Sequence, residues 1–113
     1  MSKIRDKYNC PLVLTHNLIG GKWKMIILWH ILHGDSRFSE LKRVIPDITE
    51  KVLYTNLREL EEYGIIFKEI RYDQSPTAVI YHLQKEYINL EELIDSIYEF
   101  TKNYAKLNKI EIG

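Results

Sequence analysis

The apolar positions in the middle of the chain repeat at helical spacing, with one interruption. Between residues 38 and 45 they recur every three or four residues, which predicts a short helix. Pro46 ends this helix, because proline fixes its own φ and disfavours helical geometry in the residue before it. Thr49 can cap a second helix with its hydroxyl, and Gly64 stands where that helix would end in left-handed geometry. Residues 38–64 are therefore predicted to form a helix-turn-helix.

The second of these helices is predicted to have two unlike sides. At 100° per residue, the side that packs inward carries Leu53, Asn56, Leu57 and Leu60. The opposite side carries Lys51, Tyr54, Thr55, Arg58 and Glu62. Two cations, a phenol and a hydroxyl within two turns suit a major groove with phosphates at its rim. An ordinary solvated helix face has a similar composition, so this pattern alone leaves both interpretations open.

The segments on either side extend the helix-turn-helix to a winged helix. Upstream, helical spacing predicts helices over residues 11–19 and 22–32. Downstream, the pattern changes to the partial alternation of strands over residues 65–72 and 79–83. A two-stranded hairpin directly after a recognition helix is a wing. The predicted fold class is α+β, mostly α: a winged helix-turn-helix with a hairpin wing and helices at both ends.

A long helix is predicted over residues 89–108, with Asn89 as its N-cap and Glu92 completing a capping box. Its apolar residues alternate in steps of three and four, as in a coiled-coil seam: Leu90, Leu93, Ile97, Phe100, Tyr104 and Leu107. Three further residues flank this seam, namely Ile94, Tyr98 and Ala105. The alternative is an ordinary core helix, but the apolar surplus favours a dimer contact.

Length and composition indicate one globular domain. The chain has 113 residues, of which 45% are hydrophobic and 28% charged. We divide residues 1–113 into a flexible N-terminus (1–9), the helix-turn-helix (38–64), the wing (65–83) and a dimerisation helix (89–108). The net charge is zero, but residues 1–72 hold 12 Lys/Arg against 9 Asp/Glu, and residues 73–113 hold 4 against 7. The cations thus lie mainly in the part that contains the helix-turn-helix, which permits DNA binding without requiring it.

The sequence also indicates where the protein works. No apolar run is long enough for a membrane span, and the first residues lack the apolar core of a signal peptide. A single cysteine excludes a disulfide within the chain. We therefore expect a cytoplasmic protein with no membrane partner.

Residues that could support catalysis or bind a metal are scattered. His30 and His33 lie one turn apart, but no third ligand joins them at a suitable spacing. Glu59, Glu61 and Glu62 decorate a helix without a nucleophile beside them. No phosphate-binding loop or catalytic triad is recognisable, so we expect no metal, no cofactor and no enzymatic activity.

Cys10 stands directly before the first predicted helix. The positive end of a helix dipole stabilises a thiolate, and Lys3, Arg5 and Lys7 are close in sequence. These conditions suit a redox-sensing thiol. A cysteine that only packs against its neighbours is the alternative.

The chain resembles the HxlR-type transcription regulators, a family of small winged-helix proteins akin to the MarR group. The resemblance rests on Cys10-Pro11, Leu18-Ile19-Gly20-Gly21-Lys22-Trp23-Lys24, Arg37-Phe38-Ser39-Glu40-Leu41, Ile45-Pro46, Ile48, Leu57-Arg58-Glu59-Leu60-Glu61, Gly64 and Tyr81-His82-Leu83. These residues cover the chain from about residue 10 to residue 83, and the combination is specific.

The resemblance implies a homodimer that binds pseudo-palindromic promoter DNA. The recognition positions would be Thr49, Glu50, Lys51, Tyr54, Thr55 and Arg58. Arg37 and Arg71 would contact phosphates or a groove. The first and last helices would form the dimer interface, through Leu12 and the seam residues named above. The resemblance also implies that Cys10 can sense oxidants or electrophiles, as a cysteine at this position does in some members.

The chain departs from the family pattern at three places. Thr77 and Ala78 follow the wing proline, where members often have an arginine. The segment 84–87 replaces a Thr-Glu-x-Gly type of sequence. Glu50 stands where a glutamine is common; a carboxylate repels phosphate but can accept a hydrogen bond from a cytosine amino group.

Our hypothesis is a dimeric, sequence-specific regulator that binds double-stranded DNA. The alternative is a winged-helix module that binds another protein and no DNA, which the zero net charge and the missing wing arginine favour slightly. The sequence does not identify an effector, the target genes or the sign of regulation.

Overall fold

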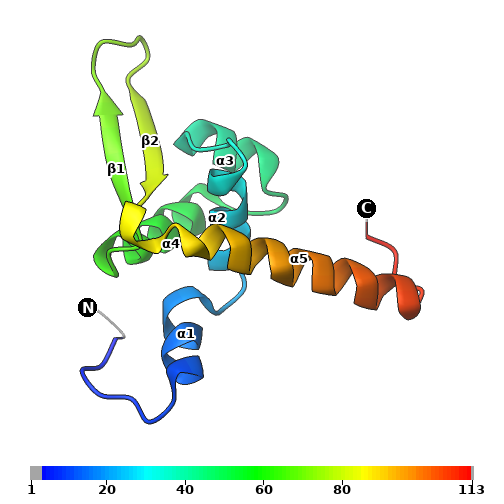
Figure 1. Ribbon diagram of the computed structural model, residues 1–113. Coiled ribbons are helices and arrows are strands. Elements are labelled where there is room, and N and C mark those ends of the chain that lie inside the picture. The colour runs from blue at the N-terminus through cyan, green and yellow to red at the C-terminus, as the bar shows by residue number, and fades with distance from the viewer. Residues whose placement is uncertain (1–3, 113) are drawn as a thin grey trace.

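The computed structural model describes residues 4–112, which form five α-helices and one two-stranded antiparallel sheet (Figure 1). The elements follow in the order α1 (Pro11–Ile19), α2 (Lys24–Leu32), α3 (Phe38–Val44), α4 (Glu50–Glu62), β1 (Ile66–Arg71), β2 (Ala78–Leu83) and α5 (Asn89–Leu107). A short 3-10 turn, Lys85–Tyr87, joins β2 to α5. The predicted fold class, a mostly helical winged helix-turn-helix, is confirmed.

The hydrophobic core lies where α2, α3, α4 and β1 meet. Its fully buried side chains are Ile27, Leu28, Leu41, Leu53, Leu57, Leu60 and Ile66. The three leucines of α4 recur every three or four residues, so they form one continuous apolar stripe against α2 and α3. Within residues 4–112, no helix combines the length and the apolar character that a membrane crossing needs.

The helix-turn-helix is shaped by the capping residues that the sequence indicated. Asp47 takes a left-handed φ of 65° in the turn after α3. The Thr49 hydroxyl then accepts a hydrogen bond from the Val52 backbone N–H at 3.1 Å and caps α4. At the other end Gly64 has a φ of 75°, and Ile65 N–H donates to the Leu60 carbonyl at 3.0 Å. This pattern closes α4 and directs the chain straight into β1.

The wing is a hairpin whose register runs from Ile66 opposite Leu83 to Arg71 opposite Ala78. A third segment, which the sequence did not indicate, pairs with its inner edge. Arg37 forms an isolated bridge with Ile80, and Tyr81 N–H donates to the Ser36 carbonyl at 2.8 Å. The connection between α2 and α3 is thereby held against β2, which brings Arg37 to the base of the wing.

Helix α5 starts beside the body and projects well beyond it (Figure 1). On the body it uses the residues that flank the predicted seam. Ile94 is buried, and the Tyr98 ring stacks on the Trp29 ring of α2 with centroids 5.1 Å apart. Near its end the chain turns back, and Ile110 N–H donates to the Ala105 carbonyl at 2.8 Å. Most side chains of the seam therefore do not pack against the rest of the monomer.

The predicted capping box at the start of α5 is wrong. Ile88, in helical geometry, is the N-cap residue, and no side chain caps the helix there. The cause is the preceding 3-10 turn, which already holds the backbone in helical geometry before Asn89 is reached. Other boundaries shift by one or two residues: α2 begins at Lys24, α3 ends at Val44, β1 spans Ile66–Arg71, β2 begins at Ala78 and α5 ends at Leu107.

The predicted flexible N-terminus, residues 1–9, is only partly described by the structure. Residues 1–3 of the predicted flexible N-terminus lie outside the described residues. In the rest of that segment, the Tyr8 hydroxyl accepts hydrogen bonds from the Asn17 side chain at 2.7 Å and from the Arg5 backbone at 3.1 Å. The segment is thereby tied to α1.

The starts of α4 and α5 allow a matched test of helix capping, because Thr49 caps α4 whereas Asn89 does not cap α5. Thr49→Ala should lower the free energy of unfolding by about 1 kcal/mol, because it removes the acceptor for the Val52 N–H. Asn89→Ala should change it by less than about 0.5 kcal/mol, since Asn89 caps nothing. Urea denaturation measures both. Equal losses for the two variants would contradict this description, and Thr49→Ser should retain most of the stability.

Candidate nucleic-acid interface

The outer side of α4 presents its polar residues to solvent. Lys51, Tyr54, Thr55 and Arg58 are all exposed, while the leucines on the other side are fully buried. The Tyr54 ring is half exposed, so it can still contact a base or sugar with one face. Thr49 and Glu50 are exposed at the N-terminal end of the helix. The predicted recognition positions therefore share one accessible surface.

Arg58 is held only weakly. Its Nε lies 3.4 Å from the Glu62 carboxylate one turn further along α4, and both side chains are substantially exposed. Exposed pairs of this kind contribute little to stability, because water screens the charges and ordering two long side chains costs entropy. The guanidinium can therefore leave Glu62 for a base edge or a phosphate at small cost.

A cleft of about 480 Å³ separates α4 from the wing. Its walls bring together Arg37 at the start of α3, Tyr54 of α4 and Lys68 of β1. Hydroxyl groups of Ser39 and Thr77 add hydrogen-bond donors. None of the described residues that line this cleft is acidic. The cleft is thus suited to an anionic strand that passes between the helix and the wing.

Lys68 was not among the predicted contacts, although strand alternation gives a signal for it. Successive side chains of a strand point to opposite faces, so Lys68 shares a face with Ile66 and Ile70. Ile66 is buried in the core, and Ile70 lines the cleft together with Lys68. The face that carries Lys68 is therefore the one that is turned toward α4.

Arg71 lies on the other face of the wing and is not among the residues lining the cleft. Its Nε donates to the Glu69 carboxylate at 2.9 Å. The second oxygen of that carboxylate lies 2.8 Å from His82 Nε2. The hydrogen bond from Arg71, and then that from His82, lower the pKa of Glu69. The predicted contact between Arg71 and DNA would have to compete with this carboxylate.

Tyr81 forms part of the cleft wall. Burial raises the pKa of Tyr81 to about 12, with smaller contributions from nearby Glu61 and Tyr54. The phenol therefore stays protonated at neutral pH and places no negative charge in the cleft. Thr77 and Ala78, which replace the family's arginine, lie at the same cleft, where Thr77 offers a hydroxyl and Ala78 is buried.

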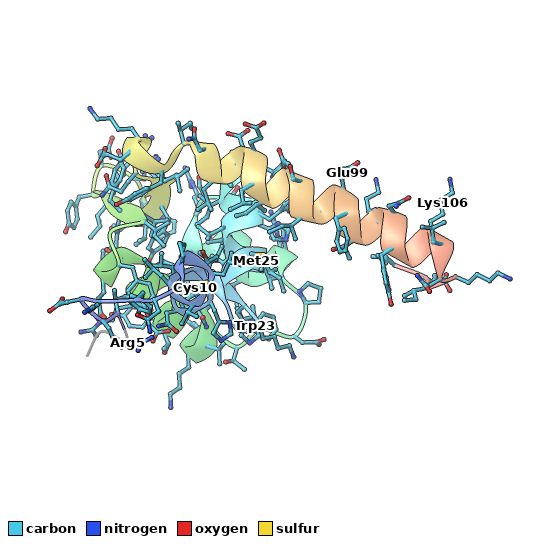
Figure 2. The ribbon with its side chains drawn as sticks, turned by 60° about the horizontal axis from the view of Figure 1, so that its bottom comes forward. Arg5, Cys10, Trp23, Met25, Glu99 and Lys106 are labelled. Carbon is cyan, nitrogen blue, oxygen red and sulfur yellow. The ribbon has the colours of Figure 1, made fainter. Side chains whose placement is uncertain are left out.

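Cys10 is exposed immediately before α1 and is a free thiol (Figure 2). It lines a shallow hollow together with Arg5, Lys7 and Tyr8. Two of the three cations expected near the thiol are thus adjacent to it, and Lys3 lies outside the described residues. Small polar reagents can therefore reach the sulfur atom.

The seam of α5 is mostly uncovered. Phe100 is 70% exposed and Leu107 73% exposed, which is unusual for large apolar side chains. Leu93 and Tyr104 are also exposed, whereas Leu90 and Ile97 are half-buried. Leu12 of α1 is 75% exposed. The predicted interface residues are thus available for contact, except for the covered parts of Leu90 and Ile97.

The two histidines of α2 make contacts that do not converge. His30 Nδ1 lies 3.2 Å from Asp35, and His33 Nε2 lies 3.3 Å from Asp95. His33 Nδ1 is 2.7 Å from the Trp29 carbonyl. Across residues 4–112, no three His, Cys, Asp or Glu side chains gather into a group that could hold a metal ion.

Comparison with known proteins agrees with this geometry. The model of the HxlR-like helix-turn-helix family matches residues 18–109. The HTH-type transcriptional regulator YtcD of Bacillus subtilis (strain 168) is 44% identical over 100 residues, which are 88% of this chain and 79% of that protein. The matching family and this relative both point to regulation of transcription.

Solved structures give the same result. The redox regulator HypR in its oxidised form matches with a TM-score of 0.75 and 39% identity, over 83% of this chain and 96% of that chain. The diamide-treated YodB from B. subtilis matches with a TM-score of 0.59 and 27% identity, over 87% of this chain and 93% of that one. YodB is a transcriptional regulator.

Proposed function

The chain belongs to the HxlR-like helix-turn-helix family of transcriptional regulators and is not an enzyme, and we propose that it binds pseudo-palindromic DNA sites as a homodimer. The observation that carries the proposal is the cleft between α4 and the wing, with Arg37 and Lys68 on its walls beside the exposed side of α4. The cleft and the exposed side of α4 together form one surface that could contact both the base edges and the sugar-phosphate backbone of DNA. The proposal includes a cytoplasmic location, since the matching regulator YtcD comes from a bacterium, in which DNA lies in the cytoplasm.

In the proposed complex α4 lies in the major groove. Thr55 and Arg58 reach base edges, where arginine can bond guanine with two donors. Lys51 contacts the phosphates at the rim. Arg37 and Lys68 hold the strand that runs through the cleft, and the Thr49 hydroxyl, which accepts from Val52, still has a proton to donate to a phosphate.

The proposed dimer forms through the seam of α5, together with Leu12 of α1. The seam residues follow the steps of three and four that a facing helix can cover, and most of them are exposed. An apolar stripe of this length on a free monomer would promote association in any case. In the proposed dimer the two α4 helices should lie about 34 Å apart, one turn of DNA, so that both can enter the major groove on one face of the duplex.

A second candidate function is a winged-helix module that binds another protein. Two observations favour it: the net charge is zero, and Arg71 is paired with Glu69 on the wing. The two candidates differ in salt dependence, because neutralising phosphates releases counterions and the pairing of two proteins largely does not.

The proposal includes a redox response through Cys10. HypR is a redox regulator, and YodB has been treated with diamide, a thiol oxidant. The chain has one cysteine, so a disulfide at Cys10 must join it to a second molecule, either another copy or a small thiol. Two thiols then lose two protons and two electrons, which reduce diamide to the corresponding hydrazine.

Three wing and helix variants test the DNA contacts. Lys68→Ala should lower the slope of log affinity against log salt by about 1, since one phosphate contact is lost. Arg58→Ala should weaken binding by about 1–3 kcal/mol and relax specificity at one base if Arg58 reads that base. Arg71→Ala is the control and should alter the slope less, because Arg71 bonds Glu69. Fluorescence anisotropy at several salt concentrations measures all three, and a flat salt dependence for the wild type would favour the protein-binding alternative.

The dimer is tested by introducing a charge into the seam. Phe100→Glu should raise the dimer dissociation constant by about thirtyfold or more, because it places a carboxylate in an apolar contact. Lys106→Glu is the control: Figure 2 shows Glu99 and Lys106 on the side of α5 that faces away from the body. Analytical ultracentrifugation compares the two. Dimers of equal stability in both variants would rule out the seam as the interface.

The redox response is tested on DNA binding. Diamide should change the DNA affinity of the wild type severalfold and leave Cys10→Ser unaffected, and a reducing thiol should reverse the change. Mass spectrometry identifies what is joined to Cys10. The redox role fails if the wild type and Cys10→Ser respond alike.

A further inference from the structure

Lys24 occupies an unfavourable place for a charged side chain. It is 8% exposed and is the one buried charged residue of the described chain. It is also the first residue of α2, where the helix dipole disfavours a cation. A buried ammonium requires partners to offset its lost hydration. Those partners all lie on α4.

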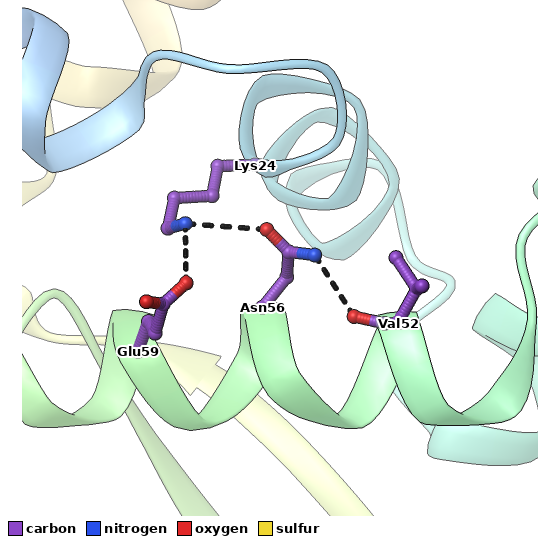
Figure 3. A network of polar contacts seen from close by, with 4 residues as sticks. All are labelled: Lys24, Val52, Asn56 and Glu59. Carbon is purple, nitrogen blue, oxygen red and sulfur yellow. Dashed lines mark hydrogen bonds and ion pairs between the residues drawn. The ribbon is translucent and has the colours of Figure 1, made fainter.

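The ammonium joins α2 to α4 at two points. Lys24 Nζ donates to Glu59 Oε1 at 2.8 Å and to Asn56 Oδ1 at 3.2 Å (Figure 3). The Asn56 amide is itself oriented, because its Nδ2 donates to the Val52 carbonyl at 2.8 Å. The Lys24 ammonium thus donates to two acceptors, Asn56 and Glu59, which lie about one turn apart on α4. This arrangement restrains both the rotation of α4 about its axis and its position along that axis.

The same helix α2 also contacts α5. Trp29 stacks on Tyr98, and His33 lies 3.3 Å from Asp95. Therefore α2 connects the helix that carries the proposed DNA contacts with the helix that carries the proposed dimer seam. On α4, Thr55 and Arg58 directly precede Asn56 and Glu59 in sequence. Any rotation of α4 on α2 would move those side chains relative to the dimer axis.

We propose that Lys24 is a positioning residue that fixes α4 relative to α5 and thereby sets the half-site spacing the dimer accepts. This inference rests on the proposed function. The buried leucines hold α4 on the body, but apolar contacts are not directional and tolerate small rotations. The two hydrogen bonds from Lys24 to α4 are directional, and they fix the orientation that the leucines leave free.

The experiment separates positioning from stability. Lys24→Met removes the ammonium, and the combination of Lys24→Met, Asn56→Leu and Glu59→Leu replaces the whole polar set by apolar residues. Such replacement of a buried ion pair is commonly neutral or stabilising, whereas removing one partner alone is destabilising. The triple variant should therefore recover the stability that Lys24→Met loses. Lys24→Arg, which keeps a charged donor, is the conservative control.

The first readout is affinity for inverted repeats whose half-site spacing is changed by one base pair in either direction. Each base pair rotates and shifts one half-site, so the wild type should prefer its best spacing by about tenfold. The triple variant should lose most of this preference despite its recovered stability, and Lys24→Arg should keep it. A triple variant with the wild-type preference would overturn the inference, since Lys24 would then act only on stability.

The second readout needs neither DNA nor a dimer. Spin labels at Thr55→Cys and Glu99→Cys, in a Cys10→Ser background and diluted with an excess of unlabelled protein, report the distance between α4 and α5 within one subunit. Pulsed electron paramagnetic resonance should give a narrow distribution with Lys24 present and a broader or shifted one in the triple variant. An unchanged distribution overturns the inference. A wild type that binds no repeat contradicts the proposed function, while this distribution still decides the role of Lys24.

Discussion

The burial of one side of α4 determines how the other elements are arranged around it. Leu53, Leu57 and Leu60 are fully buried, and each contributes about 1.5–3 kcal/mol through the removal of its side chain from water. An α-helix is rigid about its axis, so packing this stripe on α2 and α3 determines what faces outward. The exposure of Lys51, Thr55 and Arg58 follows from the burial of the leucines.

In the wing, as in α4, the burial of apolar side chains determines which side chains face outward, but in a strand the side chains alternate every second residue. Because strand side chains alternate, burial of Ile66 turns Lys68 toward α4 and Arg71 away from it. The cleft then combines cations from two elements that are distant in sequence. A chain with zero net charge can in this way present a locally basic surface, and local charge matters more than net charge within a Debye length of about 10 Å.

The sequence was sufficient wherever one local rule determined the structure. The spacing of apolar residues, Thr49 and Gly64 defined the helix-turn-helix to within a residue. The sequence-based prediction was wrong at Asn89, because a 3-10 turn precedes the helix there. The sequence also did not indicate the pairing of Ser36 and Arg37 with β2, because that pairing joins segments distant in sequence. Lys24 reads as an ordinary surface lysine, since only tertiary contact brings Asn56 and Glu59 to it.

We propose above all that the surface formed by α4 and the wing reads DNA. The most direct measurement is a selection of genomic fragments by the purified, reduced protein at moderate salt, read out by sequencing. We expect enrichment of one short inverted repeat, with half-site centres about one turn or 10–10.5 base pairs apart. Recovery of fragments without a common sequence would contradict it.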